Sequence, residues 1–180
     1  PKNLLRRPHK HHLTRLPISY NFCQAFPMRN FAILCLTFAV LLESTSGCQS
    51  PSDEAYQGGD YKTALREWKL MAEQGVADAQ FNLGWMFDEG RGIPQDYKAA
   101  VKWYTLAAKQ GHAYAQYNLG VMYDEGEDVP HNYETAVKWY TLAAKQGYVS
   151  AQCNLGVMYD EGRGIPQDYK TAVKWYTLAA

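Results

Sequence analysis

Apolar residues recur at helical spacing through most of the second half of the chain. Ala79, Leu83 and Met86 share one face of a helix, and Ala100 and Tyr104 do the same further along. Separations of three and four residues are typical of amphipathic α-helices, whereas a half-buried strand would alternate apolar and polar residues. The pattern therefore predicts two consecutive helices.

The two-helix pattern repeats with a fixed period. The segment NLGVMYDEG occurs at 118–126 and again at 154–162, and the similar NLGWMFDEG occurs at 82–90, so equivalent residues lie 36 apart. Such a period is the signature of stacked repeats that bury their apolar faces against their neighbours. We expect an all-α solenoid of stacked antiparallel helix pairs, with repeat 1 at 79–114, repeat 2 at 115–150 and repeat 3 at 151–180. Repeat 3 is expected to be truncated, because it lacks the KQG segment that closes the earlier copies.

Capping residues mark the ends of the second helix in each unit. Short polar side chains that can cap a helix N-terminus stand at equivalent positions: Asp60, Asp96, Asn132 and Asp168. Prolines that cannot continue the first helix lie just upstream: Pro94, Pro130 and Pro166. Glycines able to adopt a left-handed conformation close the second helix: Gly75, Gly111 and Gly147.

Each first helix also contains an interior glycine, at Gly84, Gly120 and Gly156. Glycine inside a helix costs about 1 kcal/mol relative to alanine. Because this cost recurs in every copy, we expect a compensating contact. Without a Cβ, the two helices of each hairpin can pack backbone to backbone, with aromatic residues at the sides.

The repeated pattern AQ.NLG.MY.EG.G.PQDY..AVKWY.LAA.QG resembles the Sel-one-like repeat, a relative of the tetratricopeptide repeat, over residues 79–180. A degenerate half unit precedes it and aligns Asp60 with Asp96. In this unit Glu67 replaces the tryptophan found at Trp103. Terminal units of solenoids have a more polar outer face, so 52–78 is interpreted as an N-terminal capping repeat with nothing stacked on its outer side.

The candidate binding site follows from positions that differ between copies. Two such positions lie four residues apart on the first helix, and a carboxylate extends the same row: Phe81, Trp85 and Asp88 in repeat 1, Tyr117, Val121 and Asp124 in repeat 2, and Cys153, Val157 and Asp160 in repeat 3. The resemblance to tetratricopeptide proteins implies that these side chains line the concave face. We expect a protein or peptide partner with apolar and basic groups to bind there. Alternatively, these side chains pack against the neighbouring repeat.

Other aromatic and ionisable residues are better explained by structure than by catalysis. Trp103 and its equivalents Trp139 and Trp175 are expected to fill a repeated packing contact. His112 and His131 are solitary, and Asp88 with its neighbour Glu89 predicts a solvated acidic rim. No catalytic residue, metal site or cofactor is expected, and the chain is not predicted to be an enzyme.

Two alternatives to a protein-binding adaptor remain open. One is a structural envelope protein with no discrete ligand. The other follows from the resemblance, because some secreted, cysteine-rich Sel-one-like proteins are linked to binding or hydrolysis of β-lactams. Their repeats carry paired cysteines, whereas Cys153 is the single cysteine in the repeats of this chain.

The first fifty residues resemble an export signal. Met28 and Arg29 precede an apolar block from Phe31 to Leu42, too short to span a membrane but typical of a secretory signal at 28–47. TSGC, ending at Cys48, resembles a bacterial lipobox, and Cys48 is the predicted lipidation site; ordinary cleavage among the preceding small residues is the alternative. Residues 1–27 are interpreted as a disordered upstream segment that is not native, and 48–51 as a short linker.

Export would leave an acidic protein in the periplasm or cell envelope, lipid-anchored or otherwise secreted. The complete chain has no formal net charge, with 18 basic and 18 acidic residues. The part after Cys48 has 12 basic and 17 acidic residues and is therefore acidic. Nucleic-acid binding depends on neutralising phosphates, so nucleic acid is not expected as a partner. A membrane is expected only through the possible lipid anchor.

Overall fold

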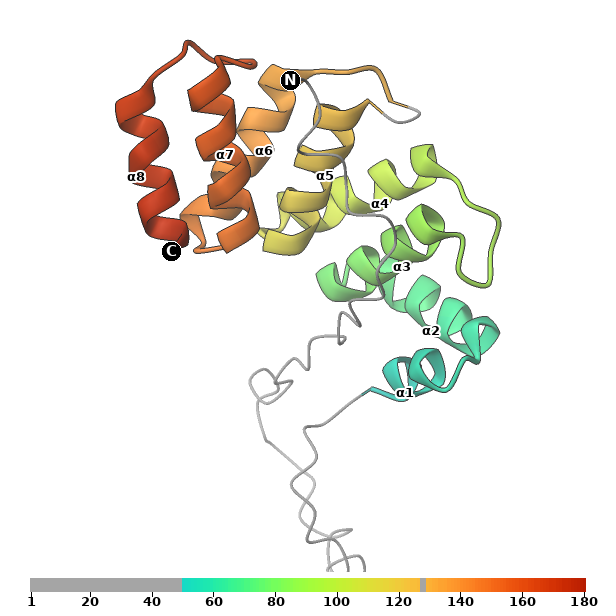
Figure 1. Ribbon diagram of the computed structural model, residues 1–180. Helices are drawn as coiled ribbons and strands as arrows, with labels where there is room; N and C mark the ends of the chain where they lie inside the picture. The colour runs from blue at the N-terminus through green and yellow to red at the C-terminus, as the bar shows by residue number, and fades with distance from the viewer. Residues whose placement is uncertain (1–49, 127–128) are drawn as a thin grey trace, which may run out of the picture.

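The computed structural model describes residues 50–126 and 129–180, and within these ranges all regular structure is helical. The helices are α1 (Pro51–Gln57), α2 (Tyr61–Glu73), α3 (Ala77–Glu89), α4 (Tyr97–Lys109), α5 (Ala113–Glu125), α6 (Tyr133–Lys145), α7 (Val149–Glu161) and α8 (Tyr169–Ala179). Each helix packs against the next along the chain (Figure 1). The predicted all-α solenoid is confirmed.

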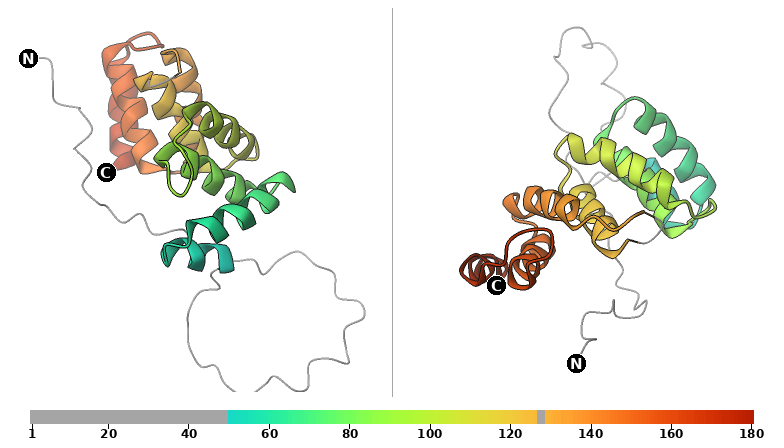
Figure 2. Two further views of the ribbon diagram at one scale, coloured as in Figure 1. Left: turned by 90° about the vertical axis from the view of Figure 1, so that its right-hand side faces the viewer. Right: turned by 90° about the horizontal axis from the view of Figure 1, so that it is seen from above.

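The hairpins α3–α4, α5–α6 and α7–α8 follow one another along an extended, curved array (Figures 1 and 2). Contacts between α4 and α5 and between α6 and α7 join successive hairpins. The first helix of each hairpin begins at residue 77, 113 or 149. These helix starts lie two residues before the predicted repeat boundaries at 79, 115 and 151, which followed the first identical letters of the repeated sequence.

The predicted caps at the second helices are confirmed. Each capping side chain accepts a hydrogen bond from the backbone N–H three residues later, at 2.9–3.1 Å. At the other end of α2, α4 and α6, Gly75, Gly111 and Gly147 adopt φ of 90°, 92° and 83°. This left-handed conformation ends each helix, because residues with a Cβ rarely adopt it.

One cap should respond to acid. The side-chain and backbone hydrogen bonds from Thr171 lower the pKa of Asp168 below its ordinary value of 3.8. Stabilisation from this carboxylate is therefore complete above the ordinary pKa and is lost as the pH falls through the lower, folded-state pKa. We expect the Thr171 amide signal in NMR spectra to titrate below pH 3.8.

The chain provides its own control, because Asn132 caps α6 through the amide of Thr135 and carries no titrating group. Asp168→Asn should keep the cap of α8 and remove the titration at Thr171, since asparagine and aspartate cap equally well. An equal shift at Thr135 and Thr171 in the unmodified chain would contradict this explanation.

The interior glycines accommodate tyrosine rings. A Cβ on Gly84 would lie 2.8 Å from the ring of Tyr104, and Gly120 faces Tyr140 even more closely. Tyr104 and Tyr140 are 0% and 1% exposed. The predicted close approach is present, and the atoms that an added Cβ would meet first belong to the tyrosine ring of the partner helix.

The repeated tryptophans pack against core clusters that span two successive units. Trp103 packs against the cluster that includes Trp68 and Leu83, and Trp139 packs against the cluster that includes Tyr104 and Leu119. Trp175 occupies the equivalent place against the cluster of Tyr140. All three are half-buried. The packing interpretation of these residues is confirmed.

The N-terminal unit contains a helix that the sequence analysis did not predict. A capping box between Ser50 and Asp53 starts α1, which packs against α2. The ring of Tyr56 lies 5.2 Å from Trp68 of α2 and 5.0 Å from Trp85 of α3. The expectation that nothing stacks on the outer side of α2 was wrong, because α1 covers aromatic surface there.

Candidate functional site

The predicted first-helix row lies between successive repeats. Phe81 and Trp85 pack against the core cluster that Tyr104 of the same hairpin forms with Leu119 of the next one, and Tyr117 and Val121 make the equivalent contact with the cluster around Tyr140. These four side chains are half-buried, as are Cys153 and Val157 in the last repeat. Part of each of these four side chains is therefore used in packing, and their role in binding a partner stays a prediction.

Some of these side chains join a larger set of partly exposed rings, which we call the aromatic row: Phe81, His112, Tyr114, Tyr117 and Tyr148. Neighbouring rings are close together, with centroids 4.6 Å apart for Phe81 and His112, and 4.9 Å apart for both Tyr114–Tyr148 and Tyr117–Tyr148. Phe81 and His112 also lie within 6.0 Å of Tyr114. The row runs from α3 past α5 to the start of α7 and crosses two junctions between repeats.

His112 fixes the geometry at one end of the aromatic row. Its Nδ1 accepts a hydrogen bond from the Ala115 amide at 3.2 Å, which makes it the N-cap of α5. The other ring nitrogen, Nε2, lies 3.3 Å from Asp78 Oδ1, and the side chain is only 6% exposed. Because Nδ1 accepts, Nε2 is the ring nitrogen that faces the Asp78 carboxylate. His112 is therefore a positioned part of the surface, not the solitary residue expected from sequence.

Three members of the aromatic row were missed by the sequence analysis: His112, Tyr114 and Tyr148. A signal for them was available, because His112 and Tyr148 are equivalent to Val76, and Tyr114 is equivalent to Asp78 and Ser150. These positions differ between copies, which is the criterion that selected Phe81 and Tyr117. Their proximity depends on the rotation between successive hairpins, which local helical spacing does not define.

The predicted acidic rim was wrong for two of its members. Tyr104 and Tyr140 donate hydrogen bonds to Asp88 and Asp124 at 3.2 and 3.4 Å. These contacts tie each first helix to the buried tyrosine of the second helix. Asp160, the equivalent residue in repeat 3, is exposed.

Asp124 also joins two repeats. Arg163 Nη1 lies 3.0 Å from Asp124 Oδ1, and the guanidinium lies over the Tyr133 ring, 5.6 Å from its centroid. Burial raises the pKa of Asp124 by more than Arg163 lowers it. Its carboxylate thus contributes to the structure at the junction and is a poor candidate for contacting a partner.

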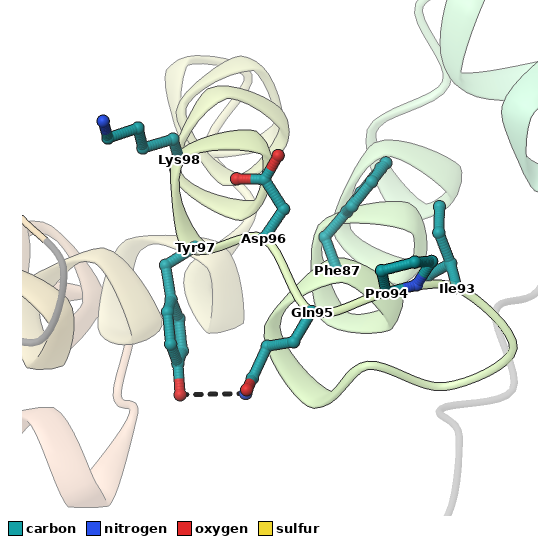
Figure 3. Close-up of a pocket in the computed structure, with 7 residues that line it drawn as sticks. All are labelled: Phe87, Ile93, Pro94, Gln95, Asp96, Tyr97 and Lys98. Atoms are coloured by element: carbon teal, nitrogen blue, oxygen red, sulfur yellow. Dashed lines mark hydrogen bonds between the residues drawn. The ribbon is translucent and has the colours of Figure 1, made fainter.

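A depression of about 560 Å³ lies beside the loop between α3 and α4 (Figure 3). Gln95 Nε2 lies 2.8 Å from the hydroxyl of Tyr97, as the dashed line in the figure shows, and donates to the carbonyl of Asp88 at 2.6 Å. The polar groups of Gln95 therefore hold the loop in place. The aromatic row remains the better candidate site.

Other types of site find little support in the part of the chain that the structure describes. Residues 50–126 and 129–180 hold no group of three or more His, Cys, Asp or Glu side chains suited to a metal ion. Across these same ranges, no helix combines the length and apolar character needed to cross a membrane. Cys153 is a half-buried free thiol. Cys48, the predicted lipidation site, and the predicted signal at 28–47 lie outside the described residues.

Comparison with known proteins identifies the repeated unit. A sequence model of the Sel1 repeat matches residues 77–112, 113–148 and 149–180, which are the structural units that begin at α3, α5 and α7. No curated protein matches the chain.

The similar solved structures include the following three. A protective antigen with an SLR fold from uropathogenic Escherichia coli is 45% identical, with a TM-score of 0.62, over 64% of this chain and 25% of that one. A Sel1 repeat protein from Oxalobacter formigenes is 36% identical, with a TM-score of 0.69, over 72% of this chain and 53% of that one. The cysteine-rich protein B of Helicobacter pylori, 16% identical with a TM-score of 0.52 over 72% of this chain and 89% of that one, shows similarity of fold alone. The chain thus spans a quarter of the E. coli protein and about half of the Oxalobacter protein.

Proposed function

The chain belongs to the Sel1 repeat family, and from this premise we propose that it is an exported scaffold that binds a segment of a partner protein over the aromatic row. Sel1 repeats generally mediate protein–protein interactions, and their fold is typically a non-catalytic scaffold. The proposal concerns the location of the site, the chemistry of the partner and the compartment.

The aromatic row is the observation that supports this site most directly. Its rings lie close together, and its four Phe and Tyr members are half-buried, whereas the His112 side chain is nearly buried. Aromatic residues contribute much of the binding energy at interfaces when a partner removes them from water. The acidic balance after Cys48, with 12 basic and 17 acidic residues, favours a partner segment that carries basic as well as apolar side chains.

Tyr114 offers a test of the site, because it lies close to three other rings of the row, those of Phe81, His112 and Tyr148, but belongs to no core cluster. Peptides selected from a random displayed library against the full chain would be titrated against Tyr114→Ser. We expect the Kd to rise about tenfold or more, which corresponds to roughly 1.4 kcal/mol. The unfolding temperature should change little.

Leu106 provides the matched control. This residue is 38% exposed on α4, a second helix, so Leu106→Ser removes apolar surface away from the aromatic row. It should leave the affinity for the same peptides unchanged. Equal weakening by both substitutions, or by neither, would reject the aromatic row as the binding site.

Export and lipidation form a separate part of the proposal. The sequence between Met28 and Cys48 supports it, and the 45% identical E. coli relative is a protective antigen. The intact mass of the chain expressed from Met28 in a bacterium provides the test. Cleavage before Cys48 with added acyl mass is expected, whereas a retained leader would reject export by this signal.

A further inference from the structure

Acidic and basic side chains are divided between the two helices of each hairpin. The first helices α3, α5 and α7 contain acidic residues but no basic residue. The second helices α4, α6 and α8, together with α2 of the N-terminal unit, hold 10 of the 12 basic residues that follow Cys48 but only three of the 17 acidic residues. The net acidic charge of this region therefore conceals a basic surface on the second helices.

The outward rows of α4 and α6 combine lysines with a leucine. We call these rows the lysine–leucine stripes: Lys98, Lys102, Leu106 and Lys109 on α4, and Lys138, Leu142 and Lys145 on α6; all seven side chains are exposed. Residues three or four apart lie on one side of a helix. The opposite side of α4 faces the core, where Ala100, Tyr104 and Ala107 are each 0% exposed. The longer stripe extends for about 16 Å along its helix.

The lysines of the stripes have no acidic partner within the part of the chain that the structure describes. Ion pairs in residues 50–126 and 129–180 are made by Arg66, His112 and Arg163, and by none of these lysines. The ammonium of Lys102 lies 5.9 Å from the centroid of the Trp103 ring. The positive charge of the stripes is therefore available to anionic groups from outside these ranges.

The leucines of the stripes are exposed inside the array. Leu106 is 38% exposed and Leu142 is 43% exposed. The helix α4 packs against α3 and α5, and α6 packs against α5 and α7, so this exposure does not depend on where the array begins or ends. An apolar side chain with cations on both sides of it in the same row fits a partner that presents apolar and anionic groups together.

We propose that the lysine–leucine stripes are a docking surface for an acidic segment of a partner protein. Its carboxylates pair with the lysines, and its apolar side chains cover Leu106 and Leu142. This surface belongs to the second helices, whereas the aromatic row belongs to the first helices and the turns before them. The proposal therefore stands independently of the function proposed above, and it gives the scaffold a second site of opposite charge.

The shape and charge of the molecule favour this occupant over two others. A segment of polypeptide can follow the curved array of hairpins (Figures 1 and 2), whereas a flat bilayer would touch only part of such a surface. A second copy of the chain is a poorer fit, because two carboxylates of its first helices, Asp88 and Asp124, already accept hydrogen bonds from tyrosine hydroxyls.

The test uses peptides selected against the full chain from a displayed library built only from acidic, apolar and small residues. Lys102→Glu combined with Lys138→Glu should raise the Kd of the tightest peptide about tenfold or more, because attraction becomes repulsion. The matched Lys102→Arg, Lys138→Arg variant keeps the charge and should bind within about twofold of the original chain. The unfolding temperature should be unchanged in both variants, since these side chains are exposed.

Leu142→Ser tests the apolar part of the surface. It should raise the Kd about threefold or more, and the effect should persist at high salt, where exposed charges are screened. Tyr114→Ser, which removes a ring of the aromatic row, should leave the Kd of the acidic peptide unchanged. Failure of one site is thus distinguishable from failure of the other.

Several outcomes would overturn the proposal. One is that the library yields no binder, and another is that the glutamate and arginine variants bind the acidic peptide equally well. Weakening by Tyr114→Ser alone would move the acidic peptide to the aromatic row. Flotation with phosphatidylglycerol vesicles and sedimentation of the chain alone examine the other occupants. Vesicle binding or self-association that the glutamate variant abolishes, without binding of acidic peptides, would assign the stripes to a membrane or to a second copy.

Discussion

Replacing Tyr140 with alanine should lower the free energy of unfolding by about 3–5 kcal/mol, the range for deleting a large buried aromatic side chain. Tyr140 is 1% exposed, and its ring fills the space above Gly120. Its hydroxyl donates to Asp124, so the substitution creates a cavity and removes a hydrogen bond from a partly buried carboxylate. Urea unfolding followed by circular dichroism would measure the loss.

Tyr176 is the matched control for this experiment. It occupies the equivalent position above Gly156, but it is 37% exposed at the edge of the array. Tyr176→Ala should therefore cost clearly less than Tyr140→Ala, because the exposed part of the ring is already in water. A loss at Tyr176 as large as that at Tyr140 would show that the buried position has no special importance.

Adding a single methyl group at Gly120 should also destabilise the protein, although alanine favours helices. Helix propensity alone would give Gly120→Ala a gain of about 1 kcal/mol. The new Cβ would overlap the ring of Tyr140, which the surrounding core prevents from moving. Overpacking typically costs about 1–3 kcal/mol, so we expect a net loss of up to about 2 kcal/mol in urea unfolding.

Gly156→Ala separates these two effects. The added Cβ would lie 2.6 Å from the Tyr176 ring, but this ring is partly exposed and can turn away. The higher helix propensity of alanine then offsets most of the free-energy cost of the clash. The free energy of unfolding should therefore stay unchanged or rise by up to about 1 kcal/mol. If both alanine variants were stabilised, the interior glycines would not be explained by ring packing.

Much of the fold could be predicted because its determinants are local. The capping of α4 by Asp96 and the left-handed Gly111 depend on residues within one or two turns, so residue type and spacing were sufficient. The period of 36 residues then required the hairpins to stack. The helix α1 was missed because it is short and lies before the repeated pattern begins.

The candidate site could be predicted only in part. Phe81 and Tyr117 were identified because they vary on one helical face, and both belong to the aromatic row. Asp88 and Asp124 were expected to face solvent, but the hydroxyls that bind them come from residues 16 positions later. Tertiary contacts of this kind depend on how two helices cross, which a periodic pattern does not specify.

The contact between Arg163 and Asp124 has a consequence for how such genes change length. Arg163 meets the previous hairpin at Asp124, and Asp88 stands where Asp124 stands, one period earlier. Loss of residues 113–148 by unequal crossing-over would bring Arg163 opposite Asp88 and α7 onto α4. Loss of one whole repeat would therefore leave an acidic partner for Arg163 at the new junction. The number of repeats can change in evolution without a new set of contacts between hairpins.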